Sequence, residues 1–252
     1  MLSLKPKATL IWMLLLHALL AVPHASAMTV VLVPGLGMEG GLWRNVSERL
    51  KAEGIESRIV QLPFTSMKDD LAATRRVTET VEGPHVLVGH SYGGMLISQA
   101  AKEGATKALI YVAAFQPEEG ESLAELNAKF PPVMSADPLI ISEDGHFTLK
   151  QEVWMRDVAN GLAAEEAAYW ERAQAAANIG IFSETAEVAG WKQLPVWSVI
   201  ATEDRTVSPD LQRFMSKRSD AQVVEVGGGH LLPLTHAAEI TDVIVKAVDT
   251  LD

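Results

Sequence analysis

A serine at position 91 stands where its hydroxyl could act as a nucleophile. Residues 87–94 read LVGHSYGG, so a Gly-x-Ser-x-Gly pentad follows a short apolar run and precedes a helix-compatible run, 95–102. Glycines at 89 and 93 would let a strand and a helix pass closely, and the sharp turn would lift the hydroxyl above the sheet edge. In this context the pentad indicates nucleophilic catalysis. The alternative is a glycine-rich turn whose serine has no catalytic role.

A serine hydroxyl needs a base to take its proton, and histidine is the residue most often used. His230 follows three glycines, Gly227–Gly229, directly after the expected strand Gln222–Val226. It would therefore lie at the carboxyl end of a strand, at the edge where Ser91 also emerges if the strands are parallel. We predict that His230 is the base, and that His90 points away from the Ser91 hydroxyl.

An acidic side chain must orient the imidazole and stabilise its protonated form. Asp204 is the candidate, because it lies just beyond the expected strand 195–200, again at a strand's carboxyl end. Glu203 is the alternative, whereas Asp210 fits the first turn of the helix that follows. The order along the chain is then Ser, Asp, His.

An acyl-transfer site also needs backbone N–H donors for the oxyanion that forms. The Tyr92 amide directly follows the serine, at the start of the next helix. The second donor is predicted to be the Leu36 amide, in the glycine-rich loop after the first expected strand. A backbone group donates in both cases, so a side-chain replacement at position 36 would not remove the donor.

The same loop supports a different interpretation. Residues 35–40 match Gly-x-Gly-x-x-Gly after a strand, which is the dinucleotide-binding fingerprint and would make NAD a cofactor. That fingerprint expects an acidic residue near the end of the second strand, but the expected strand 57–62 runs into Pro63 without one. We therefore favour the oxyanion loop and predict no organic cofactor.

Apolar strand-like runs alternate with helical stretches along the chain. Strands are expected at 29–33, 57–62, 85–88, 107–113, 195–200 and 222–226, and helices at 41–52, 67–81, 95–102, 209–217 and 237–251. This alternation predicts an α/β fold, with a mostly parallel sheet of about six strands and helices on both faces. Such a sheet would gather Ser91, Asp204 and His230 at one edge.

The interval between residues 114 and 194 breaks the alternation. A structureless loop of this length would be unusual, and helical material is expected at 151–177, so we predict an inserted helical cap at roughly 116–193. Its apolar side chains would line the site. The cap residues expected to do so are Phe130, Met134, Trp154, Tyr169, Trp170, Ile181 and Phe182, and Met95 and Leu231 are expected to join them from outside the cap.

The first 27 residues have the features of a signal peptide. Lys5 and Lys7 precede an apolar run at 8–22, and Ala25-Ser26-Ala27 offers a cleavage site. The run is short for a membrane span, and an uncleaved anchor is the alternative. We predict that residues 28–252 form one exported domain, periplasmic or secreted, without stable membrane association.

The chain is acidic and has no cysteine. Its formal net charge is -11, and removal of the two lysines in the first 27 residues would make it -13. An acidic surface argues against nucleic acid and anionic membranes as partners. Without cysteine, a thiolate nucleophile and thiolate zinc sites are excluded, and no metal is expected.

With these elements placed, the chain resembles the serine hydrolases of the α/β-hydrolase superfamily, and within it the branch of small carboxylesterases and hydroxynitrile lyases. The segments that carry the resemblance are 31–35, 86–94, 109–115, 202–205 and 226–230. The resemblance implies a triad of Ser91, Asp204 and His230, oxyanion donors at Leu36 and Tyr92, and a small-molecule ester as the substrate.

Two departures from that branch bear on the reaction. Pro34-Gly35 stand where many relatives have His-Gly. The lyases carry a lysine directly after the catalytic histidine, where it stabilises departing cyanide, whereas this chain has Leu231. Ester hydrolysis through an acyl-enzyme is therefore favoured over cyanohydrin cleavage. The alternatives are hydrolysis of amides, lactones or thioesters on the same residues, or a non-catalytic binding protein with this fold.

Overall fold

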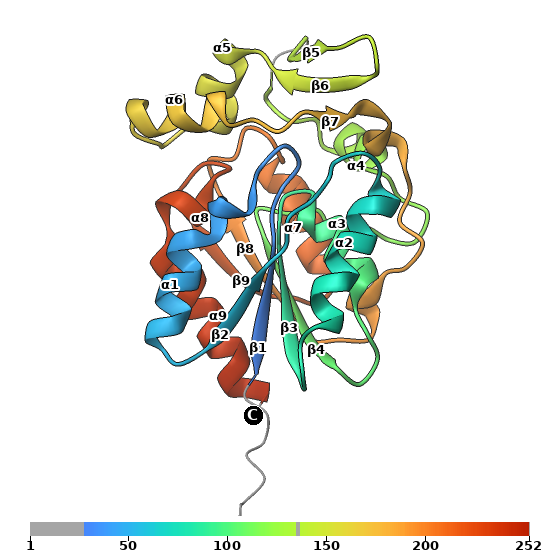
Figure 1. The fold of residues 1–252 in the computed structure, drawn as a ribbon, viewed down its shortest axis with the longest axis vertical. Coiled ribbons are helices and arrows are strands. Elements are labelled where there is room, and N and C mark those ends of the chain that lie inside the picture. Colours follow the sequence, from blue (N-terminus) through green and yellow to red (C-terminus); the bar gives the residue numbers. More distant parts are fainter. Residues whose placement is uncertain (1–27, 135–136, 252) are drawn as a thin grey trace, which may run out of the picture.

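The computed structural model describes residues 28–134 and 137–251. Its centre is a six-stranded sheet in the order β2-β1-β3-β4-β8-β9, in which all neighbouring strands are parallel (Figure 1). The strands are β1 (Thr29–Val33), β2 (Glu56–Ile59), β3 (His85–His90), β4 (Thr106–Val112), β8 (Val196–Ala201) and β9 (Gln222–Val226). The predicted parallel sheet is confirmed, and the predicted signal peptide lies outside the described residues.

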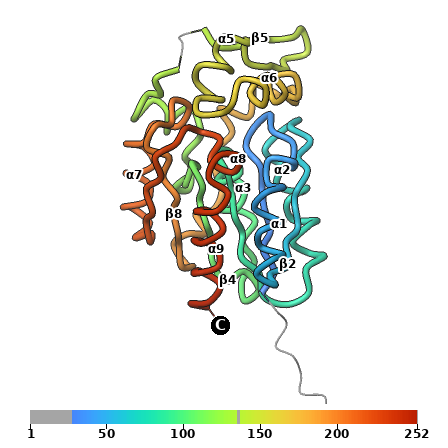
Figure 2. Tube along the Cα trace, turned by 90° about the vertical axis from the view of Figure 1, so that its left-hand side faces the viewer, coloured from blue at the N-terminus to red at the C-terminus, as the bar shows by residue number. Residues whose placement is uncertain are grey.

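Helices cover both faces of this sheet (Figures 1 and 2). On one face lie α1 (Arg44–Ala52) and α9 (Ala237–Leu251), and on the other lie α2 (Met67–Glu79), α3 (Gly93–Ala100) and α7 (Pro209–Arg218). Two short elements complete the core, the 3-10 turn η1 (Gly40–Trp43) and helix α8 (Leu232–Thr235). Among the described residues, no helix has the length and hydropathy needed to cross a bilayer.

The four central strands, β1, β3, β4 and β8, are apolar and buried on both sides, since successive side chains point to opposite faces of a sheet that helices cover twice. The edge strands β2 and β9 are largely exposed. In β1, Val30 and Leu32 pack in the core layer of α1 and α9, while Val31 and Val33 pack in the layer of α2, α3 and α7. All six residues of β3 are buried. A sheet covered on both faces leaves its ends for function, and ligands bind at the carboxyl ends of its strands.

The long segment between β4 and β8 forms a cap over those carboxyl ends (Figures 1 and 2). Its helical elements are α4 (Leu123–Lys129), α5 (Gln151–Val153), the π-helical turn η2 (Trp154–Val158), α6 (Ala164–Arg172) and the 3-10 turn η3 (Ile179–Ser183). A last 3-10 turn, η4 (Gly190–Lys192), packs instead on the C-terminal end of α3. A three-stranded antiparallel sheet accompanies them, formed by β5 (Leu139–Ile141), β6 (His146–Leu149) and β7 (Ala177–Asn178). Helical material is predicted at 151–177, where α5, η2 and α6 lie, but α4, η3 and η4 fall outside that range. The small sheet is not predicted, because strands of two to four residues are too short to show a period.

Candidate active site

Ser91 occupies the sharp turn between β3 and α3. Its φ of 52° lies in the left-handed region that side-chain-bearing residues rarely adopt, a strain on the order of 1–3 kcal/mol. The Ser91 N–H donates to the Val112 carbonyl at 3.2 Å, and the Ser91 carbonyl accepts from the Phe115 N–H at 3.1 Å. These bonds tie the strained turn to the end of β4.

The glycines of the pentad allow backbones to meet with no side chain between them. A Cβ on Gly89 would lie 2.6 Å from the Gly93 carbonyl carbon, and a Cβ on Gly93 would lie 2.6 Å from a carbonyl oxygen of β1. A Cβ on Gly94 would lie 2.0 Å from the Phe115 carbonyl oxygen. Backbone atoms cannot move aside as a flexible side chain can, so the close approach requires glycine at each position.

His230 and Asp204 form a buried pair at the carboxyl ends of β8 and β9. The His230 Nδ1 lies 2.8 Å from Asp204 Oδ2, and the two residues are 4% and 3% exposed. The carboxylate also accepts hydrogen bonds from the Thr206 and Val207 amides and from the Gln212 side chain, at 2.8 to 2.9 Å. Because a carboxylate only accepts, Nδ1 carries the proton, which leaves the Nε2 lone pair free to act as a base.

The alternative acid, Glu203, does not make this contact. Its side chain is exposed. Its backbone instead links loops, since the N–H donates to the Gly228 carbonyl at 3.0 Å and the carbonyl accepts from Asn160 Nδ2 at 2.8 Å. The structure therefore brings His230 together with Asp204, in agreement with the preferred choice from the sequence. Asp210 is in the first turn of α7, as predicted, and pairs with Arg213.

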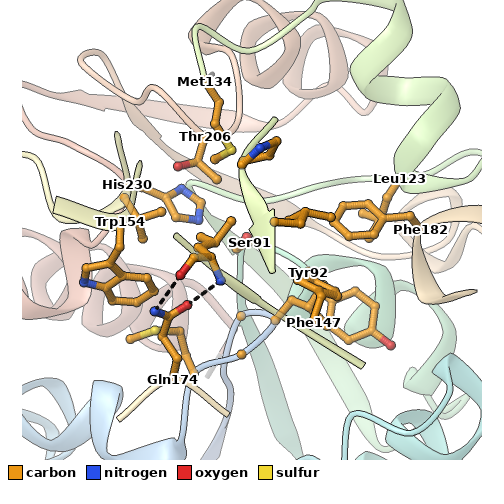
Figure 3. Close-up of a pocket in the computed structure, with 18 of the residues that line it drawn as sticks. Ser91, Tyr92, Leu123, Met134, Phe147, Trp154, Gln174, Phe182, Thr206 and His230 are labelled. Atoms are coloured by element: carbon orange, nitrogen blue, oxygen red, sulfur yellow. Dashed lines mark hydrogen bonds between the residues drawn. The ribbon is translucent and has the colours of Figure 1, made fainter. Parts of the chain in front are cut away.

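Ser91 and His230 line the same cavity, which has a volume of about 440 Å³ and lies between the sheet edge and the cap (Figure 3). The Leu36 and Tyr92 residues line it too. A Cβ on Gly35 would lie 2.9 Å from the Ser91 Cβ, so the loop that carries Leu36 touches the serine. Within the described part of the chain, neither the Leu36 amide nor the Tyr92 amide donates a hydrogen bond to another protein group.

Close packing explains why glycine is needed in the same loop, without a bound dinucleotide. Gly35 is pressed against Ser91, and a Cβ on Gly40 would lie 2.6 Å from the Ile59 side chain and closer still to Gln61. The Gly40 N–H donates to Gln61 Oε1 at 3.1 Å. These contacts account for the Gly-x-Gly-x-x-Gly spacing as a tight turn against Ser91 and β2. Among the described residues, no cluster of three or more His, Asp or Glu is arranged as metal ligands are.

His90 lies beside His230. It is among the residues that line the cavity, and its ring centroid is 4.7 Å from that of His230, while its orientation away from the Ser91 hydroxyl stays a prediction. The alternation of β3 explains this position, because His90 follows Val86 and Val88 on the face toward which the His230 loop folds. His90 Nε2 donates to the His230 carbonyl at 2.9 Å, and burial holds the pKa of His90 well below its ordinary value.

Asp70 is a buried carboxyl that sequence reasoning missed. It accepts hydrogen bonds from the Phe64 N–H at 2.8 Å and from the Tyr92 hydroxyl at 2.9 Å, and so anchors the residue that follows Ser91. Burial raises the pKa of Asp70 to about 6, against the lowering effect of these two bonds. The sequence gives only a weak indication of this role: Asp70 falls among the residues, such as Leu71, that α2 turns toward the core.

The cavity wall is largely apolar, and none of its described residues is Asp, Glu, Lys or Arg. Of the predicted pocket residues, four line it: Met134, Trp154, Phe182 and Leu231. The prediction for Met95 is wrong. Met95 is the third residue of α3, where its side chain is fully buried in the core rather than in the cavity wall. The other predicted cap residues, namely Phe130, Tyr169, Trp170 and Ile181, are not among the lining residues either.

Several lining residues were not expected, and they come from cap segments that only the fold brings together. Phe147 lies on β6, Asn127 on α4 and Gln174 after α6. Gln174 is held in place because its amide accepts from the Leu149 N–H at 2.9 Å and donates to the Leu149 carbonyl at 3.3 Å (Figure 3). No motif in the sequence marks these positions.

The cap is joined to the loop that carries Asp204. The fully buried Asp157 of η2 forms ion pairs with Arg205 at 2.7 Å and with Arg156 at 2.6 Å. Hydrogen bonds to the two arginines lower the pKa of the Asp157 carboxyl. The Thr206 hydroxyl also donates to the Asp157 carbonyl at 3.3 Å. The cap wall and the acid loop are therefore one connected unit.

Comparison with known proteins agrees with this architecture. The model of the alpha/beta hydrolase family matches residues 30–243. The chain therefore belongs to the alpha/beta hydrolase family and is of the hydrolase class, and its resemblance to that family is confirmed.

Two curated relatives are similar in sequence. The alpha/beta hydrolase nvfD of Aspergillus novofumigatus is 27% identical over 244 residues, which cover 87% of this chain and 94% of that protein. A carbendazim hydrolyzing esterase of a Nocardioides species is 52% identical over 54 residues, which cover 20% of this chain and 22% of the esterase.

Solved structures share the fold. A pyrethroid hydrolase from Sphingobium faniae has a TM-score of 0.73 at 18% identity and covers 88% of this chain and 98% of its own. A polyneuridine aldehyde esterase has a TM-score of 0.76 at 16% identity, covering 87% and 98%. At such identities the likeness concerns the fold alone.

The buried Asp70 makes stability depend on pH in a predictable direction. Its folded-state pKa of about 6 lies above the ordinary 3.8, so its contribution to stability is complete below about pH 4 and is lost as the pH rises through 6. Relative to the wild type, Asp70→Asn should therefore gain about 2 kcal/mol in free energy of unfolding between about pH 4 and pH 7. Urea denaturation across this range measures the difference.

The exposed neighbour on the same helix provides the control. Hydrogen bonds from Thr65 and Ser66 lower the pKa of Asp69, so Asp69→Asn should not show a gain of this sign. Parallel pH profiles for wild type and Asp70→Asn would contradict the shifted carboxyl.

Proposed function

We propose that this protein is an exported serine hydrolase that cleaves carboxylic esters through Ser91, His230 and Asp204. The observation that carries the proposal is the buried His230–Asp204 hydrogen bond, 2.8 Å long, in the wall of the cavity that Ser91 also lines. Membership of the alpha/beta hydrolase family supports the reaction class. The hydrogen-bonded carboxylate explains why His230 Nε2 is the basic nitrogen.

In the first half of the proposed reaction, Ser91 Oγ attacks the ester carbonyl carbon while His230 Nε2 takes the hydroxyl proton. The Leu36 and Tyr92 amides, which have no protein acceptor in the described chain, donate to the oxyanion. The carbon–oxygen bond to the alcohol then breaks, and His230 gives its proton to the departing oxygen. The product is an acyl ester of Ser91.

In the second half, water replaces the alcohol. His230 takes a proton from the water, the resulting hydroxide attacks the acyl carbon, and the bond to Ser91 Oγ breaks as His230 returns the proton. The carboxylic acid leaves and the free enzyme is restored. Asp204 stabilises the imidazolium in both halves without itself taking a proton.

An ester is favoured as substrate by the neutral surroundings of the base. Leu231, the residue after His230, is 1% exposed and lines the cavity, so no cation stands beside the leaving group there. The names of the similar proteins point the same way, since two of them are called esterases and a third a pyrethroid hydrolase. Amide, lactone and thioester hydrolysis use the same residues, and a substrate panel separates them.

Replacement of Ser91 by alanine tests the nucleophile. Ser91→Ala should lose about 10⁴-fold or more of the turnover of a short-chain 4-nitrophenyl ester, because no covalent intermediate can form. A fluorophosphonate probe should label the wild type at Ser91 and leave the variant unlabelled. Circular dichroism confirms that the variant is folded. Full activity in a folded Ser91→Ala protein would refute the mechanism, and an unreactive wild type would favour a binding protein.

A pair of acid variants tests the partner of His230. Asp204→Asn should lower kcat by about 10³- to 10⁴-fold, because an amide in place of the carboxylate favours the wrong imidazole tautomer. Glu203→Gln should stay within a few-fold of the wild type, since the Glu203 side chain is exposed and does not touch His230. The reverse order of effects would transfer the role to Glu203.

Export is the second part of the proposal and rests on the sequence pattern at residues 1–27. Cleavage after Ala27 should leave Met28 as the N-terminus of the protein recovered from the periplasm or the medium. N-terminal sequencing or intact mass spectrometry of that protein provides the measurement. A mature chain that retains Lys5 and Lys7 would support the alternative of an uncleaved anchor.

A further inference from the structure

One side-chain amide in the cavity wall has an acceptor oxygen without a partner among the described residues. Asn127 lines the cavity from α4, and its Oδ1 is buried from solvent yet accepts no hydrogen bond within the described part of the chain. Buried carbonyl oxygens of this kind are nearly always hydrogen-bonded, and one left without a partner costs about 1–3 kcal/mol. The missing hydrogen-bond donor for Asn127 Oδ1 is therefore expected to come from the molecule that occupies the cavity.

Two other polar residues of the cavity wall, Gln174 and Thr206, are already engaged. Gln174 uses both ends of its amide on the Leu149 backbone. Thr206 donates its hydroxyl to the Asp157 carbonyl. Asn127 thus differs from Gln174 and Thr206 in that its amide oxygen has no partner among the described residues.

The surroundings of Asn127 are apolar. Leu123, Ala124 and Asn127 are spaced three and four residues apart, so they share the face of α4 that lines the cavity. Phe182 and Phe147 belong to the same wall, and their rings pack on each other with centroids 5.5 Å apart. In an apolar wall of this kind the low local polarity strengthens a hydrogen bond to the Asn127 oxygen and makes an unpaired oxygen costly.

The position of His230 indicates which part of an ester reaches this wall. The departing alcohol oxygen must lie beside His230, which protonates it. In Figure 3, Leu123 and Phe182 lie on the opposite side of Ser91 from His230 and Trp154. The acyl group, which stays on Ser91 when the alcohol leaves, is thereby directed toward the α4 wall.

We propose that Asn127 is a specificity-determining residue that accepts a hydrogen bond from the acyl group of the substrate. The inference rests on the proposed ester hydrolysis and defines its substrate class: esters of uncharged, largely apolar acids that carry one O–H or N–H donor away from the carbonyl. An acyl group with a carboxylate is disfavoured, because none of the described lining residues is Lys or Arg. An acyl group without a donor leaves Oδ1 unpaired.

The test uses three matched series of 4-nitrophenyl esters. The acids are hydroxyphenylalkanoic acids, their methoxy analogues and the unsubstituted phenylalkanoic acids, each with one to three methylene groups as spacers. For at least one spacer, the wild type should prefer the hydroxyl compound over the unsubstituted one by about tenfold or more in kcat/KM. The methoxy compound, which can only accept, should show no such advantage.

Variants at position 127 should reverse this preference. Asn127→Leu removes the acceptor and extends the apolar wall, so it should turn over the unsubstituted esters as well as or better than the wild type while losing rate on the hydroxyl esters. Asn127→Ala keeps the helix and guards against overpacking. A gain on one substrate cannot come from a misfolded protein. Thr148→Val, which removes another hydroxyl from the same cavity wall, serves as the control and should leave the ratio unchanged.

The outcomes separate this inference from the proposed function. If 4-nitrophenyl acetate is not hydrolysed and Ser91 is not labelled by a fluorophosphonate, the proposed function fails. If the acetate is hydrolysed but no spacer gives a preference for the hydroxyl ester, the role of Asn127 is overturned. It is also overturned if Asn127→Leu keeps the wild-type ratio, if Thr148→Val abolishes the preference, or if the methoxy ester is favoured equally.

Discussion

The site depends on one close contact, the approach of β3, α3 and the loop after β1 to one another at Ser91. Glycines 89, 93 and 94 let the backbones meet at distances that a side chain would block. The left-handed φ of Ser91 is the strain that this geometry imposes, and two backbone hydrogen bonds to the end of β4 hold it. The same contact leaves the Tyr92 amide at the start of α3 and presses Gly35 onto the serine. The candidate nucleophile and the candidate oxyanion donors are therefore positioned by a single packing constraint.

Burial controls the ionisable groups around that contact. His90 and Asp70 shift in opposite directions, the pKa of His90 downward and that of Asp70 upward, because low polarity disfavours the charged form of each. Asp204 is buried too, but it accepts hydrogen bonds from two amides, one side-chain amide and His230. Hydrogen-bond donors thus collect at the one carboxylate whose charge the proposed mechanism uses.

The cap supplies the rest of the cavity and is attached where the chemistry is organised. Asp157 pairs with Arg205 in the loop that also holds Asp204, so a change in the cap wall is linked to the position of the acid. The wall itself is apolar apart from a few amides and hydroxyls, and Asn127 is the amide whose acceptor is unpaired in the described chain. In the proposed reaction, selectivity and reactivity would therefore come from different parts of one structure: the cap would contact most of the substrate, and the sheet edge would present the reacting groups.

Local signals in the sequence were enough to predict the main strands and helices and the turns that carry Ser91 and His230. The bounds of β1, β9 and α9 match their predictions to the residue, because each is a strongly patterned segment with clear ends. The pentad around Ser91 and the glycine run before His230 marked backbone turns that few other residues permit. Tertiary structure alone decided that Met95 belongs to the core, that His90 lies against His230, that Asp70 anchors Tyr92 and that Asn127 enters the cavity. Each of these depends on packing between distant segments, which leaves no period or motif along the chain.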